Sequence, residues 1–337
     1  MTSLNLAKIA LTLTAVLTFA ACSEAPVVKS PTLPASPLEF FQANGAPIQV
    51  QTIKVGTAPV KATFAQGTVL TFAVNAVQDG AGNAYSGDVV LNVREITSKS
   101  DMVLSNVLTI SNESPIASGG MFFLDLKTPA GAALNINPAV GVGAAVPVKN
   151  DKPLGVKDAR PMQQFVGGPT TCANTNQEVG AVTPGGAPIA TGDSSVNWCP
   201  VGGQFGIDNT TPPGSYVFSV FKKGWINCDF FYSDPRPKTT LRVTFDAIND
   251  ANTVLFLIPQ GINTVIALYT LDGAYKRKSY DNSLPIGLNT ELVALTFNNG
   301  KQYLAHKTIT VTANQNETLT FSEATAAQIK AFLTPLN

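Results

Sequence analysis

One histidine and four cysteines limit the side-chain chemistry of this 337-residue chain. A Ser-His-Asp or Cys-His arrangement would have to use His306. The alternation along Tyr303–Val311 predicts a strand that places Ala305 and Ile309 on one face and His306 on the other. We therefore expect His306 to lie exposed on a sheet rather than in a catalytic site. The sequence has no HExxH, paired CxxC or GxSxG motif, so zinc sites and nucleophile elbows of familiar form are not expected.

Three cysteines remain for other chemistry if Cys22, at the end of an apolar leader, is modified. A disulfide between Cys172 and Cys199 would close about 28 residues and stabilise the fold by roughly 3 kcal/mol. We favour this pair, which leaves Cys228 beside Asp229, whose charge raises a thiol pKa. The three thiolates and the imidazole are an acceptable zinc set. Their scattered spacing argues against zinc, and we expect neither a metal nor a cofactor.

Aromatic and acidic side chains gather after Trp225, where Asp229 and Asp234 flank the aromatic run Phe230–Tyr232. An aromatic surface beside carboxylates can stack on and hydrogen-bond a sugar, so Trp198, Trp225, Asp229 and Asp234 are the candidate ligand-binding residues. The alternative is that the aromatic residues are part of the core, as such side chains usually are. Spacing does not decide whether two carboxylates act in hydrolysis, because glycosidase acids come from distant strands. No catalytic residue is assigned.

The N-terminal segment predicts export. Lys8 precedes Ile9–Ala21, a run of 13 apolar residues and threonines, and together they have the outline of a signal peptide over residues 1–21. The run is shorter than the roughly 20 residues of a transmembrane helix. The sequence Phe19-Ala20-Ala21-Cys22 resembles a bacterial lipobox, with Phe19 in place of the usual aliphatic residue. We therefore expect lipidation at Cys22, with palmitate among the acyl chains, to anchor the protein in a membrane.

Residues 22–37 are expected to form a tether. They contain Pro26, Pro31, Pro34 and Pro37, and an extended spacer of this length reaches about 45 Å at roughly 3.1 Å per residue. Ser23 follows the lipidated cysteine, where an Asp in lipoproteins of the enteric type would indicate retention in the inner membrane. The expected localisation is the outer membrane, with the periplasmic or surface face left open.

Beyond the tether, apolar residues alternate with period two, which predicts an all-β chain. The expected strands are Ile48–Val55, Thr68–Val74, Asp88–Ile96, Met121–Lys127, Ala133–Asn137, Ser215–Phe221, Thr240–Phe245, Thr253–Ile258, Thr264–Tyr269, Glu291–Phe297 and Lys307–Thr312. Between two of them, Asp79–Asn83 has the composition of a turn. A calcium loop is the alternative, but Asp79 and Asn83 alone offer too few ligands.

Two β-sandwich-like domains in tandem are expected, at 38–150 and 151–337, because residues 141–161 have the composition of a connection and short strands with turn signals are typical of sandwiches. The second domain is expected to contain a long loop at 166–214. It is also expected to end in a short helix over Glu323–Leu333, capped by Ser322.

The charge balance excludes some classes of protein. Lys and Arg number 22, as do Asp and Glu, and charged residues make up 13% of the chain. Binding to nucleic acid needs a basic surface that neutralises phosphates, so no nucleic-acid partner is expected. A hydrophobic fraction of 45% argues against disorder.

Six short motifs carry a resemblance that covers most of residues 60–333. They are Asn83–Ile96, Lys99–Asn106, Ser118–Phe123, Met162–Phe165, Val196–Trp198 and Gly224–Phe230. These motifs resemble a group of uncharacterised, all-β envelope lipoproteins of Bacteroidota-type bacteria, with Phe230 where an Arg is expected. The N-terminal part is also distantly similar to the β-sandwich interaction domains of ankyrins and netrin receptors. Neither resemblance implies a reaction or supplies catalytic residues.

These observations predict a non-catalytic outer-membrane lipoprotein that acts as a binding or structural module of the cell envelope. Its expected partners are the membrane, through the lipid anchor, and an envelope protein or glycan. The alternative is a carbohydrate-binding or glycan-processing accessory protein that uses the segment around Trp225.

Overall fold

The computed structural model describes residues 36–112, 114–148, 162–168, 172, 196–201, 205–210 and 214–337. The predicted signal peptide, the lipidation site at Cys22 and nearly all of the tether lie outside the described residues. The predicted all-β class with a short C-terminal helix is confirmed. In the described part of the chain, no helix is both long and apolar enough to cross a membrane.

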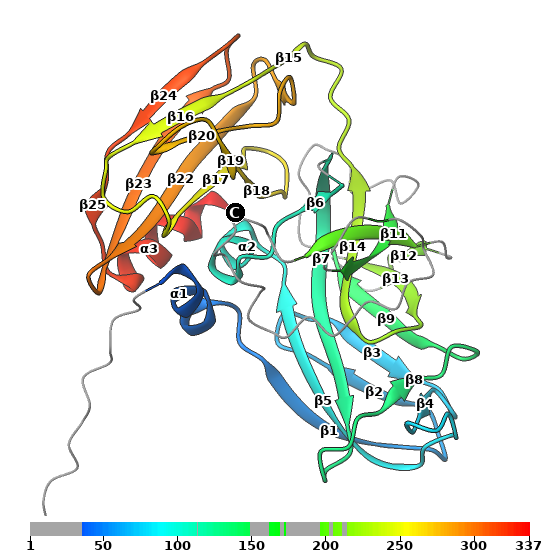
Figure 1. Cartoon of the computed structure of the whole chain (residues 1–337). Coiled ribbons are helices and arrows are strands. Elements are labelled where there is room, and N and C mark those ends of the chain that lie inside the picture. The colour runs from blue at the N-terminus through cyan, green and yellow to red at the C-terminus, as the bar shows by residue number, and fades with distance from the viewer. Residues whose placement is uncertain are drawn as a thin grey trace, which may run out of the picture. The chain divides into compact units, whose positions relative to one another are not determined.

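The first sandwich consists of two antiparallel sheets, a larger one and a smaller one (Figure 1). In order across the larger sheet, the strands are β1 (Gln49–Val55), β5 (Gly87–Ile96), β7 (Ser114–Lys127), β14 (Gly224–Phe231), β10 (Gln163–Gly168) and β11 (Asn197–Val201), with β6 (Ile110–Ser111) also paired to β7. Across the smaller sheet they are β12 (Phe205–Asp208), β13 (Ser215–Val220), β9 (Val142–Pro147), β3 (Val69–Phe72) and β2 (Val60–Thr63). A short ribbon pairs β4 (Val77–Gln78) with β8 (Asn135–Ile136). Alternate residues of both sheets, such as Leu70, Leu91 and Phe122, fill the core between them.

The second sandwich also has two sheets. One contains β19 (Thr270–Leu271), β20 (Lys276–Lys278), β16 (Arg242–Phe245) and β24 (Asn316–Leu319), and its β16–β24 pair is parallel. The other contains β18 (Ile266–Ala267), β17 (Thr253–Pro259), β22 (Asn289–Asn298), β23 (Lys301–Thr310) and β25 (Ser322–Glu323). A ribbon pairs β15 (Lys238–Thr239) with β21 (Leu284–Pro285). Val243, Leu257 and Leu292 are among the residues buried between the sheets.

Three short α-helices have their own capping residues. Ser36 caps α1 (Pro37–Asn44). Pro37 is the first residue of this helix, where the fixed φ of proline suits a helical start. Ser98 caps α2 (Lys99–Ser105). Thr325 and Gln328 form a capping box for α3 (Ala326–Leu333), which a 3₁₀ turn, Thr334–Leu336, follows. The predicted C-terminal helix therefore begins three residues later than expected, because Ser322 and Glu323 pair with β23 instead.

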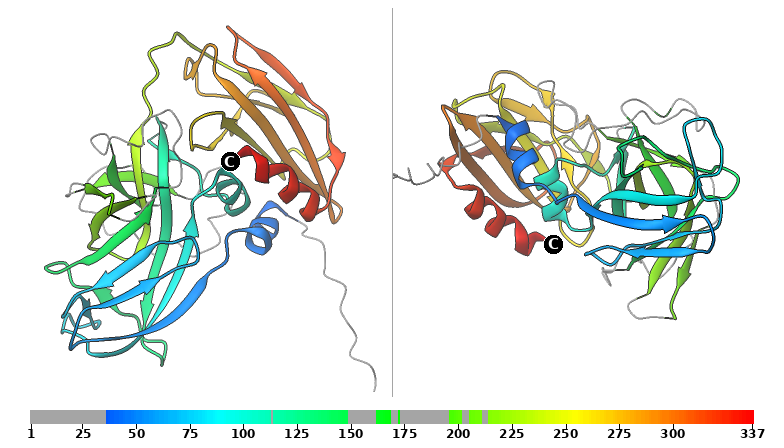
Figure 2. Two further views of the ribbon diagram at one scale, coloured as in Figure 1. Left: turned by 180° about the vertical axis from the view of Figure 1, so that it is seen from behind. Right: turned by 90° about the horizontal axis from the view of Figure 1, so that it is seen from below.

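A third core joins the two sandwiches. Helices α1, α2 and α3 lie side by side (Figures 1 and 2) and contribute Phe40, Met102 and Leu333 to it. The same cluster contains Phe297 of the second sandwich and Trp225 of the first. We call this cluster the shared core.

The boundary predicted near residue 150 does not coincide with the strand pairing. Strand β14 pairs with β7, β10 pairs with β14, and β13 pairs with β9, so strands after residue 150 complete the first sandwich. The chain passes to the second sandwich after Phe231. Strands β11 and β12 also lie inside the predicted long loop 166–214. Alternation predicts which residues form strands, but it carries no information about which strands pair.

Candidate functional site

Both tryptophans are structural. Trp198 is 0% exposed and Trp225 is 2% exposed, and their rings meet edge to face with centroids 6.3 Å apart. Nε1 of Trp198 donates a hydrogen bond to the Leu108 carbonyl at 2.6 Å. Neither indole presents a face to solvent, so the two residues form part of the shared core and not a surface for stacking a sugar.

Asp229 is also buried, at a β-bulge between β14 and β7. Its Oδ2 accepts from Nδ2 of Asn227 at 2.5 Å, and Ser118 Oγ donates to Oδ1 of the same asparagine at 2.8 Å. Oδ1 of Asp229 has no hydrogen-bond partner. Burial raises the pKa of Asp229 well above its ordinary value. Burial therefore favours the protonated form of this carboxyl and keeps it away from solvent.

The three described cysteines also have structural positions. Cys172 and Cys199, the pair favoured from the sequence, form a disulfide with Cα atoms 5.3 Å apart. Cys228 is buried, and its Sγ donates to the Gly120 carbonyl at 3.0 Å. Burial first, and then the neighbouring Asp229, raises the pKa of the Cys228 thiol. A buried neutral thiol is a poor nucleophile.

His306 lies exposed on β23, as the alternation predicted. Its Nδ1 is 3.1 Å from Oε1 of Glu291, and its ring packs against Phe332 with centroids 4.1 Å apart.

Throughout the part of the chain that the structure describes, no three His, Cys, Asp or Glu side chains are grouped as metal ligands. The predicted turn at Asp79–Asn83 is confirmed, with Asp79 Oδ1 accepting from the backbone N–H groups of Ala81 and Asn83.

Asp234 is the candidate residue that reaches a surface groove. The groove has a volume of about 600 Å³ and lies beside the segment that links the two sandwiches. Three segments line it: Tyr232–Arg236, Gln260–Ile262 and Gly287–Asn289. The first follows β14, the second follows β17, and the third leads into β22. We call it the link groove.

Asp234 holds Arg236 in place within the link groove. Its Oδ1 accepts from the backbone N–H of Arg236 at 3.0 Å and from Nε at 2.9 Å. Its Oδ2 accepts from Nη2 of Arg236 at 2.6 Å and from the Tyr232 hydroxyl at 2.5 Å. The Arg236 guanidinium holds the pKa of Asp234 well below its usual range. An aspartate with these four bonds positions its neighbour and is a poor proton donor.

The rest of the link groove combines an apolar floor with polar walls. The lining residues Ile262 and Leu288 are buried, and we call them the floor. Gln260 and Asn289 are exposed in the walls, and Oδ1 of Asn289 accepts from the Thr310 hydroxyl at 2.7 Å. Asp234 was predicted from the sequence as a ligand-binding residue, but Arg236 was not. The missed signal is an Asp-Pro-Arg sequence, in which the acid and the base are two residues apart across a proline.

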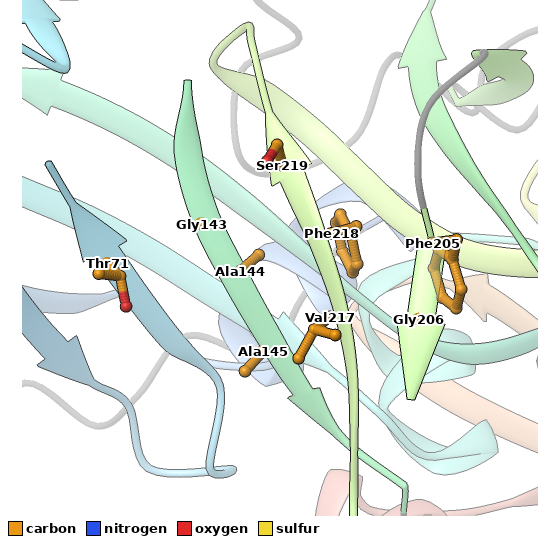
Figure 3. A pocket seen from close by; sticks show the side chains of 9 residues that line it. All are labelled: Thr71, Gly143, Ala144, Ala145, Phe205, Gly206, Val217, Phe218 and Ser219. Carbon is orange, nitrogen blue, oxygen red and sulfur yellow. The ribbon is translucent and has the colours of Figure 1, made fainter. Parts of the chain in front are cut away.

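A second groove lies on the smaller sheet of the first sandwich (Figure 3). Its volume is about 640 Å³, and strands β3, β9, β12 and β13 line it with small or apolar residues such as Gly143, Ala145 and Gly206. Thr71 and Ser219 supply hydroxyls, and no lining residue is charged. The link groove therefore offers the more specific chemistry.

Comparison with models of protein families finds none that matches the chain, and comparison with curated proteins finds no similar sequence. A function for the link groove therefore has to follow from its geometry and charge.

Proposed function

We propose that the protein is a non-catalytic, lipid-anchored module of the bacterial outer membrane that binds a ligand in the link groove. The observation that carries the binding role is the Asp234–Arg236 pair. It fixes a guanidinium at the wall of an open groove, while hydrogen bonds already occupy both oxygens of the carboxylate. This arrangement suits recognition better than proton transfer.

The anchoring role depends on the sequence features before the described residues. The apolar leader, the lipobox-like Phe19–Cys22 and the proline-rich tether support lipidation at Cys22. A diacylated or triacylated cysteine gives stable attachment, since two or more chains bind far more tightly than one. The alternative of glycan processing around Trp225 has less support, because that tryptophan and Asp229 are buried.

Labelling with radioactive palmitate in cells tests the proposal. We expect the full chain to incorporate label and to fractionate with the outer membrane, and Cys22→Ser to do neither. Cys228→Ser is the matched control, because Cys228 is a free cysteine that is buried in the fold. An unlabelled wild-type protein in the soluble fraction would contradict the anchor. Turnover of glycoside or ester substrates by the purified protein would contradict the non-catalytic assignment.

A further inference from the structure

We propose that the link groove binds a monoanionic organic acid, with Arg236 holding its carboxylate. This inference rests on the proposed binding function and names the class of ligand. The guanidinium of Arg236 has two edges from which paired N–H groups can donate. Asp234 occupies the edge formed by Nε and Nη2, and Nη1 donates to none of the described residues.

The free edge of Arg236 is accessible. The side chain is 39% exposed, whereas that of Asp234 is 6% exposed. Gly287 lies next to Nη1, and a Cβ at this position would stand 3.4 Å from that atom. The absence of a side chain at Gly287 leaves the guanidinium open toward the groove. A planar carboxylate matches the geometry of such an N–H edge.

The charges around the link groove favour one negative charge on the ligand. Asp234 neutralises Arg236, and Nζ of Lys238 donates to the Asp234 carbonyl at 2.5 Å. Asp234 and Arg236 are the charged residues in the lining. These two charges cancel within the lining, and Lys238, which lies outside it, adds one positive charge next to Asp234. A monoanion balances that charge, and a phosphate dianion exceeds it.

The other lining residues fit the body of an organic acid. Ile262 and Leu288 offer an apolar floor for its carbon skeleton. The amide groups of Gln260 and Asn289 and the hydroxyl of Ser233 are at the walls, where they can bond hydroxyls of the ligand. A hydroxylated acid such as a sugar acid uses both kinds of surface.

Titration calorimetry of the full-length lipoprotein in detergent micelles tests this inference, with sodium glucuronate, glucose and inorganic phosphate as probes. We expect glucuronate to bind at least tenfold more tightly than glucose or phosphate. Arg236→Gln is expected to weaken glucuronate binding at least tenfold. Arg242→Gln is the matched control, because Arg242 is also 39% exposed and paired with an aspartate but lies on β16. We expect this control to change binding less than twofold.

A second variant keeps the test decisive if Arg236→Gln does not fold. Gln260→Ala removes an exposed side chain from the wall, and we expect it to weaken glucuronate binding about threefold without changing the melting temperature. Equal binding of glucose and glucuronate would overturn the role of the charge, and tighter binding of phosphate would overturn the carboxylate assignment. No binding of any probe would overturn the inference, while palmitate labelling tests the anchor of the proposed function separately.

Discussion

Asp229 and Asp234 show how local surroundings assign different roles to two identical side chains. Asp229 is fully buried with one oxygen unpartnered, and burial raises its pKa. Asp234 bonds a guanidinium, and its pKa is lowered. Burial therefore favours the protonated form of the first carboxyl, and the charged partner favours the ionised form of the second. At the residue scale, desolvation dominates at one position and a charged partner dominates at the other.

The substitution Asp229→Asn tests the neutral state of the buried acid. In the unfolded chain an aspartate has a pKa of about 3.9, but folding raises that of Asp229. As the pH rises above about 4, the unfolded state loses the proton while the folded state keeps it. The free energy of unfolding of the wild type then falls by up to about 1.4 kcal/mol per pH unit until the folded-state pKa is reached. We expect urea unfolding between about pH 4 and 8 to show that Asp229→Asn gains stability relative to the wild type as the pH rises.

Asp79→Asn is the control for this measurement. Asp79 lies in an exposed turn, and hydrogen bonds, first that from the Asn83 backbone, lower its pKa. It is therefore ionised in both states above about pH 5, and its substitution is expected to add no slope there. Parallel pH curves for Asp229→Asn and the wild type would show that Asp229 is ionised in the folded protein.

At the scale of elements, one glycine allows β10, β11 and β14 to come together. A Cβ on Gly167 of β10 would lie 2.4 Å from Cγ1 of Val196 and 2.7 Å from Cβ of Trp225. It would also lie 3.3 Å from Cζ3 of Trp198. Gly167 thus leaves the space into which the two indoles pack on this face of the larger sheet.

The substitution Gly167→Ala is expected to destabilise the protein by about 1 to 3 kcal/mol, the usual cost of overpacking. Gly80→Ala is the matched control, because nothing lies within 4 Å of a Cβ at that position. Urea unfolding followed by tryptophan fluorescence measures both variants. An unchanged midpoint for Gly167→Ala would show that the core around the indoles rearranges freely.

The elements differ in how far the sequence predicts them. The apolar run Thr253–Ile258 predicted a strand, and β17 covers Thr253–Pro259, because a short apolar run rich in β-branched and aromatic residues is typical of a strand buried on both faces. Helix α2 has seven residues, too few for a clear helical period, and α1 begins at the last proline of the predicted tether. The pairing of β14 with β7 depends on contacts between distant segments, which no local pattern encodes. The sequence Asp234-Pro235-Arg236 could have indicated the ion pair, but its place in the link groove depends on loops that follow later in the chain.

At the scale of the whole described chain, the two sandwiches are joined by hydrogen bonds as well as by the shared core. The backbone N–H of Thr109 donates to the Val265 carbonyl at 3.1 Å, and Thr109 Oγ1 accepts from the N–H of the same valine at 2.8 Å. The hydroxyls of Thr109 and Thr264 are 2.6 Å apart. Nζ of Lys99 donates to the Pro259 carbonyl at 3.0 Å. Segments near α2 and β6 are therefore bonded to the region around β17 and β18.

These contacts predict that the sandwiches unfold together. Hydrogen exchange at β3 and β9, which belong to the smaller sheet of the first sandwich and contribute no residue to the shared core, reports the first sandwich. Hydrogen exchange at β22 and β23 reports the second sandwich. We expect both signals to change at the same urea concentration in the wild type. Independent tandem domains would instead give two midpoints, with β22 and β23 losing protection while β3 and β9 keep theirs.

The substitution Thr109→Val tests the link that this cooperative unfolding requires. It keeps the shape of the side chain but leaves the N–H of Val265 without the hydroxyl that accepts its hydrogen bond. We expect it to lower the free energy of unfolding by about 1 to 3 kcal/mol, the cost of a buried donor without a partner. Since Thr109 lies between the sandwiches, the exchange midpoint of β3 and β9 and that of β22 and β23 are expected to fall together. If only one of the two midpoints falls, the sandwiches are separate folding units, and the shared core is a contact surface between them.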